Sequence, residues 1–319
     1  MVVIERKYDF TVSIVMLTYN HESYIKQAIE GVLIQKTNFT IELIIGEDCS
    51  KDNTREICEE YAFKYPIIHL LPSQTNLGMM PNFIRSLNAC NGKYIAVCDG
   101  DDYWTEPNKL QSQIDFLETN VDYSICFHNS KYLWENNSRN NLKMVSPFQK
   151  KTSYLENIIF DNFMPTNSVV FKNQPTIKYP SWFSTLKFGD WVLWILNAQY
   201  GKIGYINETM AVYRVHSTGA ASSAIMDSQK MKENMTAMIQ TYTLIDEYFN
   251  FSYKKLIEKR IAYYKKLAWR QGNQSILYIK LLGYIESLQN YNWLTRCIHF
   301  TNNMNKFIKG YINRLGVNR

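Results

Sequence analysis

Three aspartates lie within four positions of one another, directly after a short apolar run. The run covers residues 94–98 (YIAVC), and Asp99, Asp101 and Asp102 follow it, with Gly100 between the first two. Neighbouring carboxylates repel one another unless a cation or strong hydrogen-bond donors compensate their charge. Oxygen ligands suit Mg²⁺ or Mn²⁺, which also take oxygens from a substrate's phosphates. We therefore predict a divalent-cation site here, the alternative being a solvated acidic turn in which Asp102 caps the next helix.

Polar residues also follow the other apolar runs of the first hundred residues. Three runs have the composition of strands, at 12–18, 41–46 and 67–71. The polar segments after them are TYNHE at 18–22, EDCSKD at 47–52 and SQTNLG at 73–78. Helical segments separate the strands, which predicts a parallel sheet with right-handed crossovers. Because ligands bind at the carboxyl ends of such strands, we expect these segments and the aspartates to form one site.

The second half of the chain follows a different pattern. Beyond residue 102 the sequence predicts helices at 107–118 and 191–200 and strands at 123–128, 168–171, 203–206 and 210–215. Residues 228–319 are predicted to be helical throughout.

The segment from Glu47 to Thr54 is a second acidic loop. Its carboxylates and hydroxyls can accept hydrogen bonds from a base N–H or a ribose hydroxyl. Ser50, Asp52 and Asn53 can also cap the helix that follows. We expect the loop to do both.

Glycine-rich phosphate loops are missing from the sequence. The first strand is followed by Thr18, Tyr19 and Asn20 without glycines, so the dinucleotide fingerprint GxGxxG is excluded there, and GxxxxGK[ST] occurs nowhere. Phosphate charge must therefore be met mostly by a metal and by side chains. The same absence counts against a nucleotidyltransferase that cradles a triphosphate.

In combination, these segments resemble glycosyltransferase family 2, the inverting sugar-nucleotide enzymes with the GT-A fold. The resemblance covers roughly residues 10–225 and is carried by the segments 12–33, 46–54, Asn76-x-Gly78-x-x-x-Asn82, 97–118, GDWVLW at 189–194 and MAVYRVHSTGAAS at 210–222. It implies an α/β fold of the Rossmann-like GT-A type. In that fold a mixed, mainly parallel sheet is flanked by helices, here with a helical C-terminal extension.

The resemblance also implies roles for individual residues. The predicted nucleotide-sugar-binding residues are Thr18, Tyr19, Asn20, Glu22, Asp48, Asn76, Asp99, Gly100 and Asp101, with Asp48 at the base, commonly uracil. The implied metal ligands are Asp101, Asp102 and His216. Asp190 matches the catalytic base, although the usual acidic pair is here Gly189-Asp190. The alternatives are that Asp190 caps the helix predicted at 191–200 and that His216 forms a hydrogen bond within a loop.

The implied activity is transfer of a sugar, with inversion, from a nucleotide-diphosphate donor to a hydroxyl group. We expect a UDP-sugar donor, Mn²⁺ or Mg²⁺ as cofactor, and a glycan or lipid-linked saccharide as acceptor, in surface polysaccharide biosynthesis. Two other functions stay open: a nucleotidyltransferase on a similar sheet, and a non-catalytic nucleotide-sugar-binding protein. The missing glycine-rich loop counts against the first, and the aspartates at 99–102 together with Asp190 count against the second.

Charge is distributed unevenly along the chain. Residues 1–227 hold 20 Lys and Arg against 24 Asp and Glu, and residues 228–319 hold 15 against 5. We therefore expect a catalytic domain at 1–227 and a basic helical region at 228–319. In residues 306–315 the apolar side chains fall on one helical face and the basic ones lie away from it. This pattern is typical of a helix on anionic lipid, and equally of a helical cap on the catalytic domain or on a dimer mate.

Composition excludes several other classes of protein. Apolar residues make up 46% and charged residues 20%, which is typical of globular chains. No apolar run reaches the roughly 18 residues of a membrane span, and the first ten residues carry charge where a signal peptide is apolar. The six cysteines lack zinc-ligand spacing, and no nucleic-acid-binding module is apparent. We therefore expect a cytoplasmic protein, with peripheral attachment to the inner face of the membrane where the basic region contacts lipid.

Overall fold

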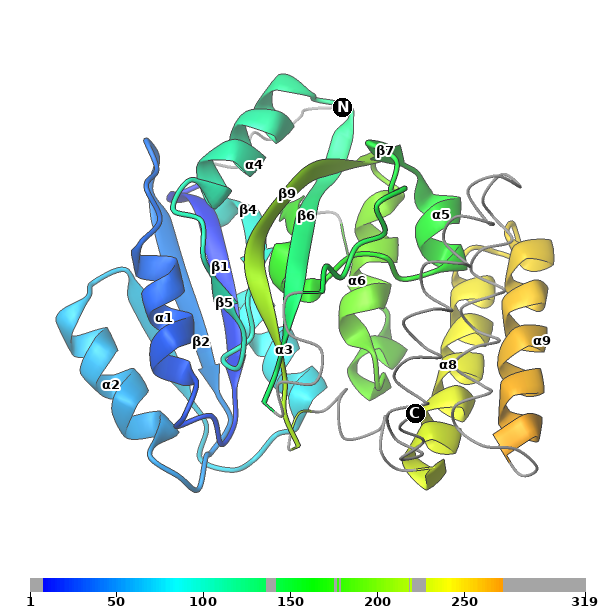
Figure 1. Ribbon diagram of the computed structural model, residues 1–319, viewed down its shortest axis with the longest axis horizontal. Helices are drawn as coiled ribbons and strands as arrows, with labels where there is room; N and C mark the ends of the chain where they lie inside the picture. The colour runs from blue at the N-terminus through cyan, green and yellow to red at the C-terminus, as the bar shows by residue number, and fades with distance from the viewer. Residues whose placement is uncertain are drawn as a thin grey trace, which may run out of the picture.

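The protein is built around one twisted sheet with helices on both faces (Figure 1). The computed structural model describes residues 8–135, 142–174, 177, 179–217, 219 and 228–271. The strands are β1 Phe10–Thr18, β2 Ile41–Glu47, β3 Ile68–Pro72, β4 Gly92–Val97, β5 Tyr103–Trp104, β6 Tyr123–Trp134, β7 Thr152–Ser153, β8 Val170–Lys172 and β9 Lys202–Val215. The α-helices are α1 Ile25–Leu33, α2 Thr54–Lys64, α3 Met79–Asn88, α4 Lys109–Thr119, α5 Leu155–Phe160, α6 Gly189–Ala198, α8 Ser228–Tyr248 and α9 Lys254–Gln271. Short 3₁₀ turns cover Thr166–Ser168 and Ser181–Thr185.

The N-terminal half is the predicted series of parallel strands. In the order β3-β2-β1-β4, each strand pairs in parallel with the next. Alternate residues of β1 enter two different cores: Val15 packs with α3 and α6 on one face, and Ile14 and Met16 pack with α1 and α4 on the other. Burial on both faces explains why β1 is almost continuously apolar. It also brings the carboxyl ends of these strands to one edge.

The C-terminal half turns the sheet into a mixed one. β8 pairs antiparallel with β4 and with β6, whereas β9 pairs in parallel with β6 along most of its length. The two strands expected at 203–206 and 210–215 are one strand, β9. The polar pair Asn207 and Glu208, which divided them in the sequence, is exposed in mid-strand. Because β9 ends beside the acidic turn after β4, its last residues are placed at the site.

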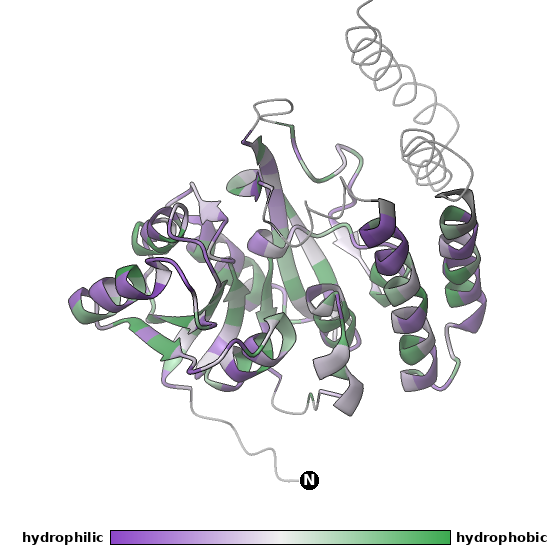
Figure 2. Ribbon diagram, turned by 90° about the horizontal axis from the view of Figure 1, so that it is seen from below, coloured by the Kyte–Doolittle hydropathy of each residue, from purple (hydrophilic) through white to green (hydrophobic). Residues whose placement is uncertain are grey.

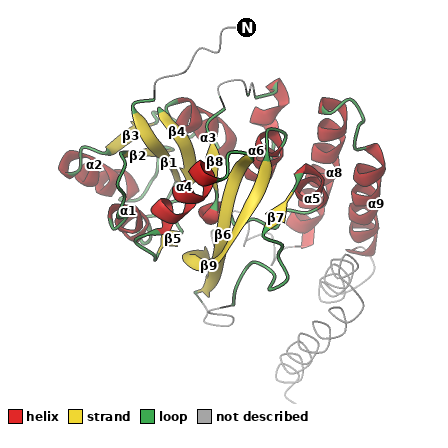
Figure 3. Ribbon diagram, turned by 90° about the horizontal axis from the view of Figure 1, so that it is seen from above, coloured by secondary structure: helices red, strands yellow, loops and turns green. Residues whose placement is uncertain are grey.

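The C-terminal helices pack on the same core as α5 and α6. α8 and α9 lie next to each other beside α5 and α6 (Figures 1 and 3). Tyr242 of α8 is fully buried; its hydroxyl donates to the Ile159 carbonyl at 3.1 Å and its ring meets Trp191 edge-on at 4.9 Å. Arg260 of α9 lies over the Phe160 ring at 4.8 Å. Residues 228–271 therefore share a core with α5 and α6.

The helical extension is polar on its outer side. Along α8 and α9 hydrophilic and hydrophobic residues alternate, whereas the sheet is largely hydrophobic (Figure 2). Within the described residues, no helix has both the length and the apolar character needed to cross a bilayer.

Two predictions concern the C-terminal region. The basic segment predicted at 306–315 lies outside the described residues, and the domain boundary expected after residue 227 falls at the start of α8.

Candidate active site

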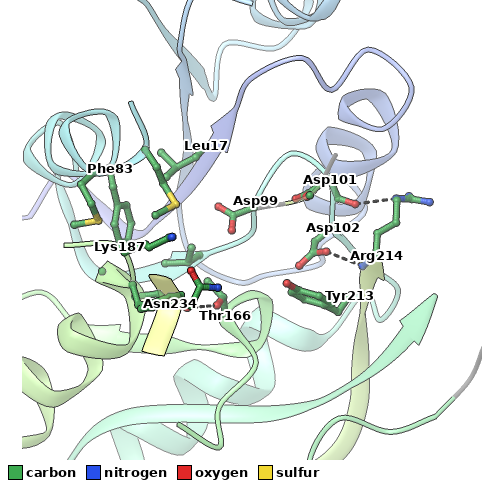
Figure 4. Close-up of a pocket in the computed structure, with 17 residues that line it drawn as sticks. Leu17, Phe83, Asp99, Asp101, Asp102, Thr166, Lys187, Tyr213, Arg214 and Asn234 are labelled. Carbon is green, nitrogen blue, oxygen red and sulfur yellow. Dashed lines mark hydrogen bonds between the residues drawn. The ribbon is translucent and has the colours of Figure 1, made fainter. Parts of the chain in front are cut away.

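A cavity of about 340 Å³ opens where the carboxyl ends of β1 and β4 face the N-termini of α3 and α6. Its lining is acidic on one side, with Asp99, Asp101 and Asp102, and largely apolar on another, with Leu17 and Phe83 (Figure 4). Asp190 at the start of α6 also lines it, as do the end of β9 and the first part of α8. The structure thus brings together the acidic turn and the predicted base, which are about 90 positions apart in the chain.

The turn after β4 presents Asp101 to two imidazoles. The Gly100 N–H donates to the Leu17 carbonyl at 2.8 Å, and a Cβ at position 100 would lie 2.8 Å from Thr18 Oγ1, so this close approach requires glycine. His216 Nε2 lies 3.0 Å from Asp101 Oδ2, and His21 Nε2 lies 4.0 Å from the same oxygen. Burial raises the pKa of Asp101, but the hydrogen bond to His216 and the nearby His21 outweigh it and hold that pKa below its ordinary value. Asp101 is therefore a carboxylate.

Asp99 is the first residue of the acidic turn and is close enough to both Asp101 and Asp190 to be affected by their charges. Burial, followed by the charges of Asp101 and Asp190, raises the pKa of Asp99 to about 8, so this carboxyl group is mostly protonated at neutral pH. A cation or a cationic ligand group that enters the cavity would favour its charged form.

Asp102 has a structural role. It is 3% exposed, and its two carboxylate oxygens accept hydrogen bonds from the Arg214 backbone N–H and from Asn167 Nδ2, each at 2.9 Å. Asn167 in turn donates to the Val212 carbonyl at 3.0 Å. Asp102 thus ties the acidic turn to β9 and to the 166–168 turn. Of the three predicted metal ligands, Asp101 and His216 lie close to each other, with His216 Nε2 3.0 Å from Asp101 Oδ2. The metal contact predicted for Asp102 stays a prediction.

Asp190 is held in the first turn of α6. The helix begins at Gly189 with Phe188 as its N-cap, so Asp190 is not the helix cap that the sequence offered as an alternative. Thr166 Oγ1 donates to Asp190 Oδ2 at 2.6 Å, and the Trp191 N–H donates to Oδ1 at 2.7 Å. A carboxylate oxygen has two lone pairs, so each oxygen keeps one for a substrate proton.

The loops after β1 and β2 are joined by hydrogen bonds. Asn20, in the left-handed region with φ 55°, accepts from the Lys51 N–H at 2.8 Å through Oδ1. Glu22 Oε2 accepts from the Asn53 N–H at 3.0 Å. Thr18 is buried beside His21, whereas Tyr19 is 37% exposed and open to a ligand. The acidic loop therefore holds the loop after β1. At the start of α2, Asp52 Oδ1 accepts from the Thr54 N–H at 3.0 Å, whereas the N-cap residue Asn53 makes no side-chain cap bond. The contact of this loop with a base or ribose stays a prediction.

Asp48 shapes the loop after β3. Its Oδ1 accepts from the Leu77 N–H at 2.8 Å and its Oδ2 from the Gly78 N–H at 2.9 Å. Asn76 Nδ2 closes the same turn by donating to the Asp48 carbonyl at 3.0 Å, and Gly78 adopts a positive φ of 86°. Asp48 and Asn76 therefore lie side by side, and the contact with the base predicted for Asp48 stays a prediction.

Three further residues line or border the site without having been singled out. His21 lies in the polar segment that follows β1, so its position in the sequence could have indicated that it borders the site. Thr166, the partner of Asp190, lies in a polar segment between two strands, which was a weaker one. Asn234 reaches the cavity from α8 and carried no local signal, because one asparagine in a polar helix is ordinary.

The residues present fit a divalent cation that is shared with a ligand. In the part of the chain that the structure describes, no three His, Cys, Asp or Glu side chains are arranged to hold a metal by themselves. Asp101 and His216 offer one oxygen and one nitrogen 3.0 Å apart. Such a partial site suits a metal that takes its other ligands from phosphate oxygens and water.

Comparison with known proteins gives one family. The model of Glycosyl transferase family 2 matches residues 13–173. An uncharacterised protein of Mycobacterium tuberculosis (strain ATCC 25618 / H37Rv) is 38% identical over 222 residues, which cover 69% of this chain. The match spans 63% of that relative's own length.

Two solved structures have a similar fold. TarS 1-349 of S. aureus, in complex with UDP-GlcNAc, gives a TM-score of 0.54 at 18% identity over 84% of this chain and 81% of that one. The mannosyltransferase PcManGT from Pyrobaculum calidifontis, in complex with GDP-Man and Mn²⁺, gives 0.53 at 14% identity over 98% and 91%. The likeness confirms the predicted GT-A fold. Because the family model also spans 161 of the 319 residues, the chain belongs to glycosyl transferase family 2.

Proposed function

We propose that the protein transfers a sugar, with inversion, from a nucleotide-diphosphate donor to an acceptor hydroxyl, and that Asp190 is the general base. The observation that carries this proposal is that Asp190 lines the same cavity as Asp99 and Asp101. A carboxylate on one side of a sugar and a diphosphate-binding group on the other are what a single displacement at the anomeric carbon needs.

The donor nucleotide is assigned to the loops after β1, β2 and β3. Tyr19 is exposed there, and the 76–78 turn is held by Asp48. TarS is in complex with UDP-GlcNAc and PcManGT with GDP-Man, which supports a nucleotide-sugar donor. We expect UDP as the nucleotide.

Asp101 and His216 would hold the divalent cation. When bound, the cation supplies positive charge that stabilises the leaving diphosphate. Mn²⁺ is favoured over Mg²⁺ because an imidazole nitrogen is a poor ligand for magnesium. PcManGT is in complex with Mn²⁺, which is consistent with this choice.

Asp190 takes the proton of the attacking hydroxyl. Thr166 and the Trp191 N–H fix its two oxygens in the first helical turn, so the free lone pairs point in a defined direction. One displacement inverts the anomeric centre, because the hydroxyl attacks from the side opposite the diphosphate.

The acceptor is a glycan or lipid-linked saccharide, in surface polysaccharide biosynthesis. On α9, Lys255, Lys259 and Lys266 are exposed and recur at helical spacing. This basic face supports peripheral contact with an anionic membrane, where lipid-linked acceptors reside.

The test is donor turnover in a panel of UDP-, GDP- and dTDP-sugars, with Mn²⁺, with Mg²⁺ and with EDTA. We expect release of a nucleoside diphosphate from one class of donor, fastest with Mn²⁺. Release of pyrophosphate from a nucleoside triphosphate and a sugar phosphate would instead identify a nucleotidyltransferase.

A further inference from the structure

The C-terminal helix α8 contributes one polar side chain to the cavity. Asn234 lines it, and its Oδ1 is buried without a hydrogen-bond partner among the described residues. Figure 4 shows Asn234 and Thr166 on the side of the cavity away from Asp101 and Arg214.

A buried acceptor without a donor destabilises the free protein. Asn234 is not needed to hold α8, since the helix is fixed by Tyr242 and its neighbours two turns further on. An oxygen of this kind is explained when a ligand supplies the missing donor.

The position of Asn234 identifies which ligand that is. In an in-line displacement, the attacking hydroxyl and the leaving diphosphate lie on opposite sides of the anomeric carbon. The diphosphate belongs with Asp101 and His216. Asn234 lies on the same side of the cavity as Thr166, which holds the base Asp190, and so on the acceptor side.

The apolar part of the lining fits a sugar ring. Leu17, Met80, Phe83 and Phe188 form an apolar surface in the same cavity. A pyranose presents C–H groups on one face and hydroxyls at its edge, so an apolar wall and an isolated amide oxygen match it together.

We propose that α8 forms a wall of the acceptor subsite and that Asn234 Oδ1 accepts a hydrogen bond from a hydroxyl of the acceptor sugar. This assignment rests on the proposed function. It makes Asn234 a specificity-determining residue for the acceptor and gives the C-terminal helical region a direct part in the reaction.

The experiment compares Asn234→Ala and Asn234→Leu with the wild type in the full chain. Leu keeps most of the side-chain volume, so the pair separates a lost hydrogen bond from an enlarged cavity. Thr236→Ala is the matched control, because Thr236 is exposed on the same helix and its hydroxyl donates only to the Lys232 carbonyl of that helix. The probes are p-nitrophenyl glycosides as acceptors, with the donor that the wild type consumes. The readouts are the acceptor KM, the ratio of transfer to donor hydrolysis, and Tm without ligands.

We expect both Asn234 variants to raise the acceptor KM and to lower the transfer-to-hydrolysis ratio by about tenfold, the size of one hydrogen bond. The Tm of Asn234→Leu should equal or exceed that of the wild type, because an unsatisfied oxygen is removed, and Thr236→Ala should match the wild type throughout. Unchanged acceptor KM and transfer ratio in both variants would overturn the inference, as would a fall in Tm with transfer and hydrolysis lost in proportion. A wild type that consumes no donor at all would overturn the proposed function itself.

Discussion

The proposed nucleotide-binding loops and the proposed acceptor side of the cavity are built in different ways. The loops after β1, β2 and β3 contribute no residue to the lining of the cavity, and they hold one another: Asn20 bonds to Lys51, Glu22 to Asn53, and Asp48 to the 76–78 turn. The proposed acceptor side is assembled from α6, the 166–168 turn and α8, and its polar groups make fewer hydrogen bonds within the protein. Among the described residues, each Asp190 oxygen accepts one hydrogen bond from a neighbouring group and Asn234 Oδ1 has no partner.

The groups that make the site rigid are therefore different from the groups that are proposed to contact the reacting substrate. Groups whose hydrogen bonds are already made within the protein fix the shape that receives the nucleotide, and they contribute to the stability of the fold. Groups that keep unpaired oxygens lower stability and gain their partners only from substrate. Substitutions on the acceptor side should therefore change turnover far more than stability, and those on the nucleotide side should change both.

Asp190→Asn tests the acceptor side most severely. The substitution keeps the shape of the side chain but removes the base, so we expect kcat to fall by about 10³-fold, within the range of general base catalysis. Nucleotide affinity, measured by isothermal titration calorimetry with UDP and Mn²⁺, should stay within about twofold. Asp115→Asn on α4, an exposed carboxylate bonded only to Gln111, is the control. Turnover near the wild-type value in Asp190→Asn would exclude Asp190 as the base.

His216→Ala tests the proposed metal site. We expect the affinity for Mn²⁺ in the presence of UDP to fall at least about tenfold, because an imidazole beside Asp101 is lost. Titration followed by electron paramagnetic resonance measures free Mn²⁺ without relying on activity. His69→Ala, a half-exposed histidine on β3, should bind Mn²⁺ as the wild type does. Equal affinities in all three proteins would contradict the assignment of His216.

Asp48→Ala tests whether the nucleotide side contributes to stability. The Leu77 and Gly78 N–H groups would lose their acceptors, so we expect the free energy of unfolding to fall by about 2 kcal/mol in urea denaturation. The control is Asp122→Ala, which breaks the exposed ion pair with Lys202 and should change stability far less than Asp48→Ala does. If Asp48 serves only the base, its loss will weaken UDP binding and leave stability unchanged.

The sequence predicted those features of the site that depend on short segments of the chain. β1, β2 and β4 are continuous apolar runs with polar ends, and chain connectivity alone brings such ends to one edge of a parallel sheet. The acidic turn and the 47–54 loop could therefore be found in advance, whereas Asp190 was indicated only by the resemblance to the family. The split predicted within β9 failed because Asn207 and Glu208 are exposed in mid-strand, and surface exposure is not visible in a short window.

What the sequence could not predict depends on tertiary contacts. Asp101 and Asp102 are adjacent in the chain, yet their surroundings differ. Asp102 accepts hydrogen bonds from Asn167 and from the Arg214 backbone, whereas Asp101 faces His216. Nothing in the spacing distinguishes them. Asn234 likewise enters the site only because Tyr242 and Arg260 dock the two C-terminal helices on α5 and α6.

The smallest expected effect comes from a buried amine beneath the acidic turn. Lys109 is fully buried, with Nζ 3.8 Å from the centroid of the Trp104 ring and a hydrogen bond of 2.8 Å to Gln113. Trp104 Nε1 donates to the carbonyl of Asn167, the partner of Asp102, so the amine supports the 166–168 turn and the anchor of Asp102. Burial lowers the pKa of Lys109 to about 7 from 10.5.

The sign of the resulting pH dependence follows from proton binding. Between pH 7 and 10.5 the unfolded chain binds this proton and the folded chain does not, so stability rises with pH in that window and is lost as pH falls towards 7. Lys109→Met removes the group, and we expect the wild type to gain about 1 kcal/mol per pH unit relative to the variant between pH 7.5 and 8.5. Burial raises the pKa of Cys58, Cys90 and Cys126 to about 12, but these thiols occur in both proteins and cancel in the difference. Parallel curves of unfolding free energy against pH would show that Lys109 is charged in the folded protein, and the network under Asp102 would then have to hold a cation instead of a neutral amine.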